Sequence, residues 1–513
     1  MADLSTAAGK WLTPLIAALF AALAVFAWYQ YAPVTSDNVE PASRVDRQGG
    51  NQVYFGPPNS IAVLPFGSDA GAGAQLALSH GFASELHRLL TRTRGLRVTS
   101  RNSSWFFQDH SIPLKVIAER LRVTHLLLGD FQSRDDAIDV RVRLFNAKRD
   151  QELWSQDYQL DLSGVFSLQD EILDSVLEAM NRPPLDGLPR ARPVNPHAWE
   201  RYLEGLYQRD KRTTEGLAEA EAAFRSALEI DPAYSLARIG LAGVLLGRHA
   251  SSAQAADLPD QARALLLTAL ENEPDLPAAY GLISYIRHDY DWDWHGALDA
   301  AERATRLSPD DPDLMGVAGM ALFTLGQFDR AGRMLEAKVR QDPLNLANRI
   351  RLGVLKEFNG EFDQSLSNYR QVIGLNPEFP GAHAYRARVK IIQDKPESAM
   401  EESEQEPDPF WNRYARILSL FALQQDQEAE QLLQQMIVED GGHAAYQVAE
   451  IMAFSGDTDK AFNWLQRAIE QKDGGMGEVL GNYFLRNLHA DPRWKTTLNS
   501  LGLGDLNLAS PDA

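Results

Sequence analysis

Apolar side chains recur at helical spacing through the C-terminal two-thirds of the chain. In the stretch AEAAFRSALEIDP, Ala220 is followed by Phe224, Ala227 and Pro232. The pattern returns with its closing prolines 42, 35, 34 and 34 residues apart, at Pro274, Pro309, Pro343 and Pro377. Such a regular period predicts stacked helical hairpins, because one hairpin cannot bury its apolar face without neighbours.

The residue types suit that arrangement. Small residues let the two helices of a hairpin approach closely, larger ones such as Phe224 and Tyr369 fill the space between hairpins, and proline ends the second helix. The pattern resembles the tetratricopeptide repeat family, with five clear units over 195–377, a degenerate sixth over 378–409, and two more around Ala429 and Ala461. The resemblance implies an all-α tetratricopeptide solenoid. The alternative is a non-repeating helical domain with chance alanine spacing.

A different pattern precedes the repeats. Continuous apolar runs, short helical stripes and one alternating stretch, Ile138–Phe145, predict an α/β domain with a mixed sheet, one face of which is partly solvated. We expect strands at Ser60–Phe66, Gly95–Arg101, Thr124–Gln132, Ile138–Phe145 and Glu152–Leu160. Helices are expected within 76–90, 114–121 and 165–180.

Several phrases in this region resemble the TolB amino-terminal-like domain. They are Ile61–Phe66, Gly95–Val98 with Arg101 and Ser103, Leu126–Gly129, Leu153–Trp154 with Tyr158, and Phe166 with Leu168–Ile172. The resemblance implies a domain that often lies between a membrane helix and tetratricopeptide repeats in bacterial envelope or regulatory proteins. Some members of that family carry a winged-helix or nucleotide cyclase domain before the membrane helix, and we recognise neither here.

The N-terminal region carries an uncharged apolar segment, Leu12–Tyr29, flanked by Trp11 and by Trp28, Tyr29 and Tyr31. Eighteen uncharged, mostly apolar residues with aromatic side chains at both ends predict a single transmembrane helix. A signal peptide cleaved after Val25–Ala27 and a soluble core helix are the alternatives. We expect a bacterial inner-membrane protein with a cytoplasmic stub and the bulk of the chain in the periplasm, the alternative being repeats in the cytoplasm.

These patterns divide the chain into six regions. The predicted boundaries are 1–31 for the stub and transmembrane helix, 32–58 for a flexible spacer, 59–181 for the α/β domain, 182–194 for a linker, 195–472 for the solenoid, and 473–513 for a C-terminal helical cap and tail.

Charge changes the expected partners. The chain has 513 residues, no cysteine and a net charge of −20. From Asn195 onward there are 31 Lys and Arg against 49 Asp and Glu, so residues 195–513 carry −18 of that charge. An array this acidic would repel a phosphate backbone, and we therefore expect no nucleic-acid partner.

Two stretches resemble known ligand-binding loops but lack residues that those loops require. The sequence Gly71–Leu76 opens a helix as a dinucleotide loop would, but it ends in leucine and no carboxylate follows the next strand. The alternating carboxylates of Asp289–Asp299 suggest a calcium loop, but Trp294 and Ala300 stand where glycine and glutamate are needed. We predict no catalytic residue, no cofactor and no metal site.

The predicted function is protein binding. In tetratricopeptide arrays the first helix of each unit lines the concave side, and the family pattern places eight residues of this sequence there: Ile239, Tyr285, His288, Met320, Phe323, Ile350, Val354 and Arg388. This largely apolar row predicts a groove for a peptide or helix of another protein, in a scaffold or a signal-receiving protein. A small-ligand sensor acting through the α/β domain is the alternative of another class.

Overall fold

The computed structural model describes residues 55–67, 73–107, 112–134, 137–161, 165–183, 195–250 and 257–504. The predicted membrane segment at 12–29, the spacer up to residue 54 and most of the linker lie outside these residues. Among the helices that the structure describes, none is long and apolar enough to cross a membrane.

A five-stranded mixed sheet forms the N-terminal part, as predicted. Its strands are β1 (Ser60–Val63), β2 (Arg97–Val98), β3 (His125–Arg134), β4 (Ala137–Asn146) and β5 (Gln151–Asp161). They lie in the order β2-β1-β3-β4-β5, with β1 parallel to both neighbours and β3, β4 and β5 antiparallel. Along β4, Val140, Val142 and Leu144 are buried while Arg141 is exposed, so the expected alternation is confirmed.

The second strand is shorter than predicted. The side chain of Ser100 accepts a hydrogen bond from the backbone nitrogen of Asn102 and caps a short helix, α3 (Arg101–Ser104). A capped helix start has non-strand geometry beyond it, so β2 ends at Val98 and the chain turns away from the sheet.

Helices cover both faces of the sheet. Helices α2 (Ala74–Thr91) and α5 (Val165–Ala179) share one apolar cluster with Ile61, Val63 and Leu127. Helix α4 (Leu114–Leu121) packs on the opposite face with Ala62 and Leu126. Successive strand residues point to opposite faces, which is why neighbours in β1 belong to different clusters.

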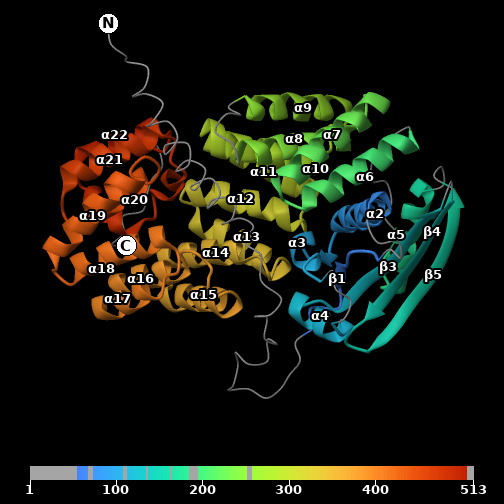
Figure 1. The fold of residues 1–513 in the computed structure, drawn as a ribbon, viewed down its shortest axis with the longest axis horizontal. Coiled ribbons are helices and arrows are strands. Elements are labelled where there is room, and N and C mark those ends of the chain that lie inside the picture. Colours follow the sequence, from blue (N-terminus) through green and yellow to red (C-terminus); the bar gives the residue numbers. More distant parts are fainter. Residues whose placement is uncertain are drawn as a thin grey trace, which may run out of the picture.

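Eight helix pairs follow, in agreement with the eight units read from the sequence. They are α6 (Pro196–Asp210) with α7 (Thr214–Ile230), α8 (Ser235–Ala250) with α9 (Leu258–Asn272), α10 (Pro277–Ile286) with α11 (Trp294–Leu307), α12 (Pro312–Thr324) with α13 (Phe328–Gln341), α14 (Leu346–Phe358) with α15 (Phe362–Leu375), α16 (Ala382–Ile392) with α17 (Pro396–Glu404), α18 (Pro409–Ala422) with α19 (Asp426–Asp440), and α20 (Ala445–Phe454) with α21 (Thr458–Glu470). Figure 1 shows them as an arch that runs from the sheet to the far end of the molecule.

The repeat pattern works as its residue types suggested. The ring of Phe224 on α7 lies between Gly205 on α6 and Gly240 on α8, where an added Cβ would approach it to 2.5 and 2.7 Å. Gly353 meets the ring of Tyr369 in the same way, at 2.3 Å. Glycine on the first helix therefore makes room for the aromatic side chain of the second helix.

The acidic stretch of the third pair is a turn between helices. A π-helical turn, η4 (Arg287–Asp291), extends α10, and Trp292 adopts a left-handed conformation with φ of 60°. Asp293 then caps α11 by accepting a hydrogen bond from Gly296 N at 2.9 Å, and Trp294 is buried. Capping and tryptophan packing account for this part of the pattern.

The chain ends in short helices that close the arch. They are η5 (Gly474–Glu478), η6 (Tyr483–Leu488) and α22 (Pro492–Ser500). Segments η5 and η6 pack on α20, η5 also contacts α12, and α22 contacts α21. Lys472 donates a hydrogen bond from Nζ to the carbonyl oxygen of Tyr290 at 2.6 Å, which ties this end to the third pair.

The sheet and the repeats share one apolar core. Helix α2 packs along α6 (Figure 1). The rings of Phe82 and Trp199 meet edge to face with centroids 6.3 Å apart, and both side chains are buried. The α/β part is thus packed onto the first helix pair through apolar side chains.

Candidate interaction surfaces

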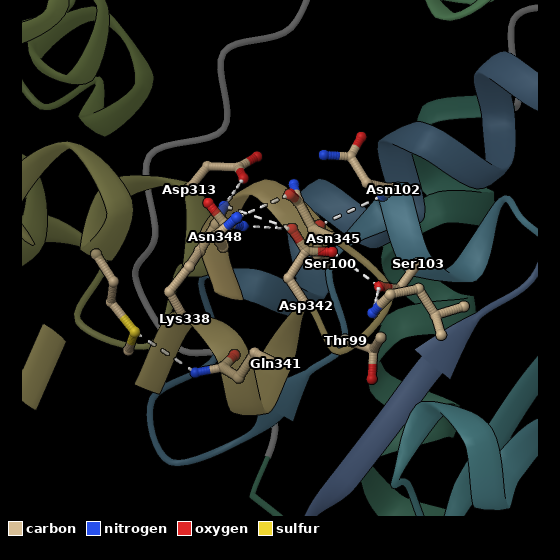
Figure 2. Close-up of polar contacts among 12 residues, drawn as sticks. Thr99, Ser100, Asn102, Ser103, Asp313, Lys338, Gln341, Asp342, Asn345 and Asn348 are labelled. Atoms are coloured by element: carbon tan, nitrogen blue, oxygen red, sulfur yellow. Dashed lines mark hydrogen bonds and ion pairs between the residues drawn. The ribbon is translucent and has the colours of Figure 1, made fainter. Parts of the chain in front are cut away.

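A polar seam joins the α/β part to the middle of the repeats (Figure 2). Ser103 donates from Oγ to Asp342 Oδ1 at 2.8 Å and accepts from Leu344 N at 3.1 Å. The backbone nitrogen of Ser100 donates to the carbonyl oxygen of Gln341 at 2.8 Å. The turn between α13 and α14 therefore holds α3 by its backbone as well as by its side chains.

Lys338 and Asp342 are buried in the seam, and Lys338 also pairs with Asp313, whose side chain is exposed. Lys338 Nζ lies 2.6 Å from Asp313 Oδ1 and 3.8 Å from Asp342 Oδ2. The Lys338 cation lowers the pKa of Asp313 to about 2, whereas burial raises the pKa of the Asp342 carboxyl. Asn348 Nδ2 donates to Asp342 Oδ2 at 3.2 Å, so both oxygens of this fully buried carboxylate have partners.

Further contacts extend the seam along the repeats. Gly95 N donates to Asp310 Oδ2 at 2.7 Å, and Ser308 Oγ donates to the carbonyl oxygen of Thr91 at 3.2 Å. Arg97 Nη2 donates to the carbonyl oxygen of Arg340 at 2.9 Å. The α/β part therefore contacts the first, third, fourth and fifth helix pairs.

A second buried polar cluster lies on the first helices of the later pairs. Arg388 on α16 donates from Nη2 to Glu357 Oε1 at 3.0 Å and from Nη1 to Glu450 Oε1 at 2.7 Å. It also donates to the Tyr414 hydroxyl at 2.6 Å, and that hydroxyl donates to Glu450 Oε2 at 3.1 Å. Burial raises the pKa of Glu357, while the Arg388 cation acts in the opposite direction.

The C-terminal segment covers this cluster. Asn482 donates from Nδ2 to the Tyr446 hydroxyl at 2.8 Å and also contacts Glu450. The ring of Phe484 lies 4.9 Å from the Arg388 guanidinium carbon, a cation–π distance. Residues 474–488 thus lie against α12, Phe358 of α14, Arg388 of α16 and helix α20, and of the eight predicted groove residues they meet Arg388 directly.

The structure buries five of the eight predicted groove residues. These are Ile239, Phe323, Ile350, Val354 and Arg388, each at most 9% exposed. Phe323 stacks on Phe358 with centroids 5.3 Å apart, and an added Cβ on Gly481 would lie 2.0 Å from Phe358. The exposed apolar row expected from the sequence is therefore absent at these five positions, because the α/β part, neighbouring helices and the C-terminal segment cover them.

The other three predicted groove residues are partly exposed and lie on neighbouring elements. Tyr285 belongs to α10, His288 to η4 and Met320 to α12. His288 Nε2 lies 2.9 Å from Thr324 Oγ1, a hydrogen bond that links the third and fourth pairs. This part of the inner face keeps side chains in reach of solvent.

The polar seam and the covering segment were not foreseen from the sequence. Asp342 follows the second helix of the fourth unit and reads as an ordinary cap, and Glu357 and Glu450 read as solvated charges. A signal did exist in α14, where Ile350 lies on one side of the helix and Leu352 and Leu355 lie on another, a pattern that indicates burial on more than one side.

Comparisons with known proteins agree on the repeats. A family model described as tetratricopeptide repeat matches residues 292–345. Residues 292–345, which span α11, α12 and α13, therefore match a tetratricopeptide repeat. Solved structures with similar folds include YrrB, titled a TPR protein with an unusual peptide-binding site, at 19% identity over 41% of this chain and 98% of that one with a TM-score of 0.31.

Two further matches differ in what they cover. PilF of Pseudomonas aeruginosa is 16% identical over 44% of this chain and 98% of its own, with a TM-score of 0.34. A curated protein of Rhizobium meliloti (strain 1021), described as putative adenylate cyclase 3, is 24% identical over 252 residues, which are 48% of this chain. The chain spans only 42% of the length of that relative.

Proposed function

We propose that this protein is a membrane-anchored scaffold that binds another protein through its tetratricopeptide repeats. The observation that carries the proposal is the array of eight helix pairs with a partly exposed stretch of inner face on α10 and α12. Repeat arrays present extended surfaces for partners rather than enclosed catalytic sites. Among the described residues, no group of three or more His, Asp and Glu side chains could hold a metal ion.

The binding surface proposed here is the stretch around Tyr285 and Met320. It lies between the seam with the α/β part and the C-terminal segment, so its length suits a short extended peptide. Residues 195–513 carry a charge of −18, which favours a basic partner segment by electrostatic attraction. Apolar side chains of that segment would contact Tyr285 and Met320 as anchors.

The membrane part of the proposal rests on the sequence. Residues 12–29 are an uncharged apolar segment of sufficient length to span a bilayer, and we infer that the rest of the chain lies in the periplasm. A periplasm-active enzyme reporter fused after residue 513 should be active and a cytoplasm-dependent reporter silent. The opposite result would favour a membrane-tethered adaptor in the cytoplasm.

Site-specific crosslinking tests the partner surface. A photo-crosslinking amino acid is placed at Met320 in the full chain, in intact membranes, and a matched one at Val438 on α19, which is 84% exposed. We expect one dominant crosslinked protein from position 320 and none from position 438. Met320→Lys should abolish capture of a basic partner, whereas Val438→Lys should not. Equal crosslinking from both positions would overturn the proposed surface.

A further inference from the structure

Arg349 is a buried cation without a described counterion. It lies in the first turns of α14 and is 6% exposed. Buried arginines are nearly always paired with a carboxylate or another anion, because taking the charge out of water is costly. Among the described residues, the guanidinium group of Arg349 makes one hydrogen bond, from Nη1 to the amide oxygen of Gln371 on α15, at 2.8 Å.

The geometry leaves one side of the guanidinium group available. Gln371 holds Nη1, and Gln371 is itself oriented by a hydrogen bond from its Nε2 to Ser367 Oγ at 3.4 Å. Nε of Arg349 is buried and has no hydrogen-bond partner. Nε and Nη2 form the side of the planar fork that binds a carboxylate or phosphate through two parallel hydrogen bonds. The group is thus held in place with its bidentate side unused.

The surroundings of Arg349 are positive. Arg122 ends α4 in a left-handed conformation close to the start of α14: Arg97 Nη2 donates to the carbonyl oxygens of both Arg122, at 3.0 Å, and Arg340, at 2.9 Å, and Leu344 packs on the apolar cluster of α4. Burial and the charge of Arg122 lower the pKa of Arg349 to about 10. This concentration of arginines is unexpected in a chain with 70 Asp and Glu against 50 Lys and Arg, which has carboxylates in excess.

We propose that Arg349 and Arg122 bind an oxyanion, the carboxylate or phosphate group of a small soluble ligand, between α4 and the α14–α15 pair. The ligand supplies the negative charge that the surrounding residues do not. Because Arg122 belongs to the α/β part and Arg349 to the repeats, the bound anion bridges the two. Ligand binding would then stabilise the seam next to the proposed protein-binding surface without forming part of that surface.

Thermal unfolding of the full chain in detergent tests this site. The midpoint is measured in phosphate, sulfate and succinate, with sodium chloride at equal ionic strength as the reference. We expect at least one oxyanion to raise the wild-type midpoint by about 2–4 °C. A larger effect of phosphate and sulfate would indicate a phosphate-bearing ligand, and a larger effect of succinate a carboxylate-bearing one.

Three variants make the test specific. Arg349→Met should lose the oxyanion shift and should not unfold earlier than wild type in chloride, because it removes an uncompensated buried charge. Arg349→Lys keeps the charge without the fork and should lose most of the shift. The control Arg386→Met breaks a pair with Glu402 at 2.8 Å on α17, so it should lower the midpoint and keep the shift.

Two results would overturn the proposal. One is a wild-type midpoint that responds to the three oxyanions no more than to chloride. The other is an oxyanion shift that persists in Arg349→Met, which would place the bound anion elsewhere. Crosslinking of the partner at Met320 is independent of either result, so failure of this site is distinguishable from failure of the proposed scaffold function.

Discussion

Two arginines on the first helices of successive repeats, Arg388 on α16 and Arg349 on α14, are both buried but have different surroundings. Arg388 contacts Glu357, Glu450 and the Tyr414 hydroxyl. Arg349 has an amide oxygen as its described partner. The same residue type therefore has two roles in one array: Arg388 neutralises carboxylates within the fold, and Arg349 presents an unused hydrogen-bonding edge.

The different surroundings of Arg388 and Arg349 show how a buried charge in a repeat array can be interpreted. The paired charges of the Arg388 cluster help to specify how the C-terminal segment packs onto the inner face, since Asn482 and Phe484 both contact the cluster. Arg349 has no carboxylate partner and its Nε lacks a hydrogen bond, a state that calls for an explanation, and we attribute it to the ligand proposed above. Removing the charge of Arg388 should therefore lower the free energy of unfolding, whereas removing the charge of Arg349 should leave it unchanged or raise it.

The largest effect is expected for Arg388→Met. This change leaves Glu357 and Glu450 buried without their cation, which should lower the free energy of unfolding by about 3–5 kcal/mol. Guanidinium chloride unfolding of the full chain measures it, with Arg349→Met as the matched comparison, for which no loss is expected. If both variants lost the same stability, Arg349 would have a counterion as Arg388 does.

Phe323→Ala is expected to cost about 3 kcal/mol or more, as for other buried aromatic side chains. Phe323 stacks on Phe358 beneath the C-terminal segment, so its removal opens a cavity. Met320→Ala, on the same helix but partly exposed, should cost about 1 kcal/mol. Chemical unfolding compares the two, and a small loss for Phe323→Ala would mean that the segment does not cover this part of the inner face.

Much of the fold could be predicted from sequence because its signals are local. The alanine period gave the helix pairs, and the alternation in Ile138–Phe145 gave a half-solvated strand. The inner-face positions could be assigned to first helices from the family pattern, but their burial could not. It depends on contacts such as Arg388 with Glu450 and Ser103 with Asp342, which are 62 and 239 residues apart in the chain. The repeat pattern alone does not show which distant segment of the chain covers a given face of a helix.

Ser103→Ala tests the seam from the α/β side. The change removes the donor to Asp342 and the acceptor for Leu344 N, and leaving these buried groups unpaired should cost about 1–3 kcal/mol. Asp342 keeps its contacts with Asn348 and Lys338, so the loss should stay below that of Arg388→Met. The control Ser500→Ala, at an exposed position of α22, should leave the unfolding midpoint unchanged, and equal effects would argue against a packed seam.

The smallest expected effect is a pH dependence at the C-terminal segment. Burial, with Glu450 and Glu357 nearby, raises the pKa of Glu478 from its ordinary 4.5 to about 7, while Arg388 and Arg351 act in the opposite direction. Because the pKa of Glu478 is higher in the folded state, the folded protein keeps this proton between about pH 4.5 and 7, where the unfolded chain has lost it. The contribution of Glu478 to stability is therefore complete below pH 4.5 and is lost as the pH rises through about 7.

Glu478→Gln removes this titration without changing the size of the side chain. We expect the variant and the wild type to unfold at similar denaturant concentrations at pH 4.5, and the variant to be the more stable one at pH 8. Other buried carboxyls, such as Asp342, titrate in both proteins, so the difference between the two curves isolates Glu478. Parallel curves across this range would show that Glu478 is solvated, and that the C-terminal segment covers the Arg388 cluster less closely than its contacts indicate.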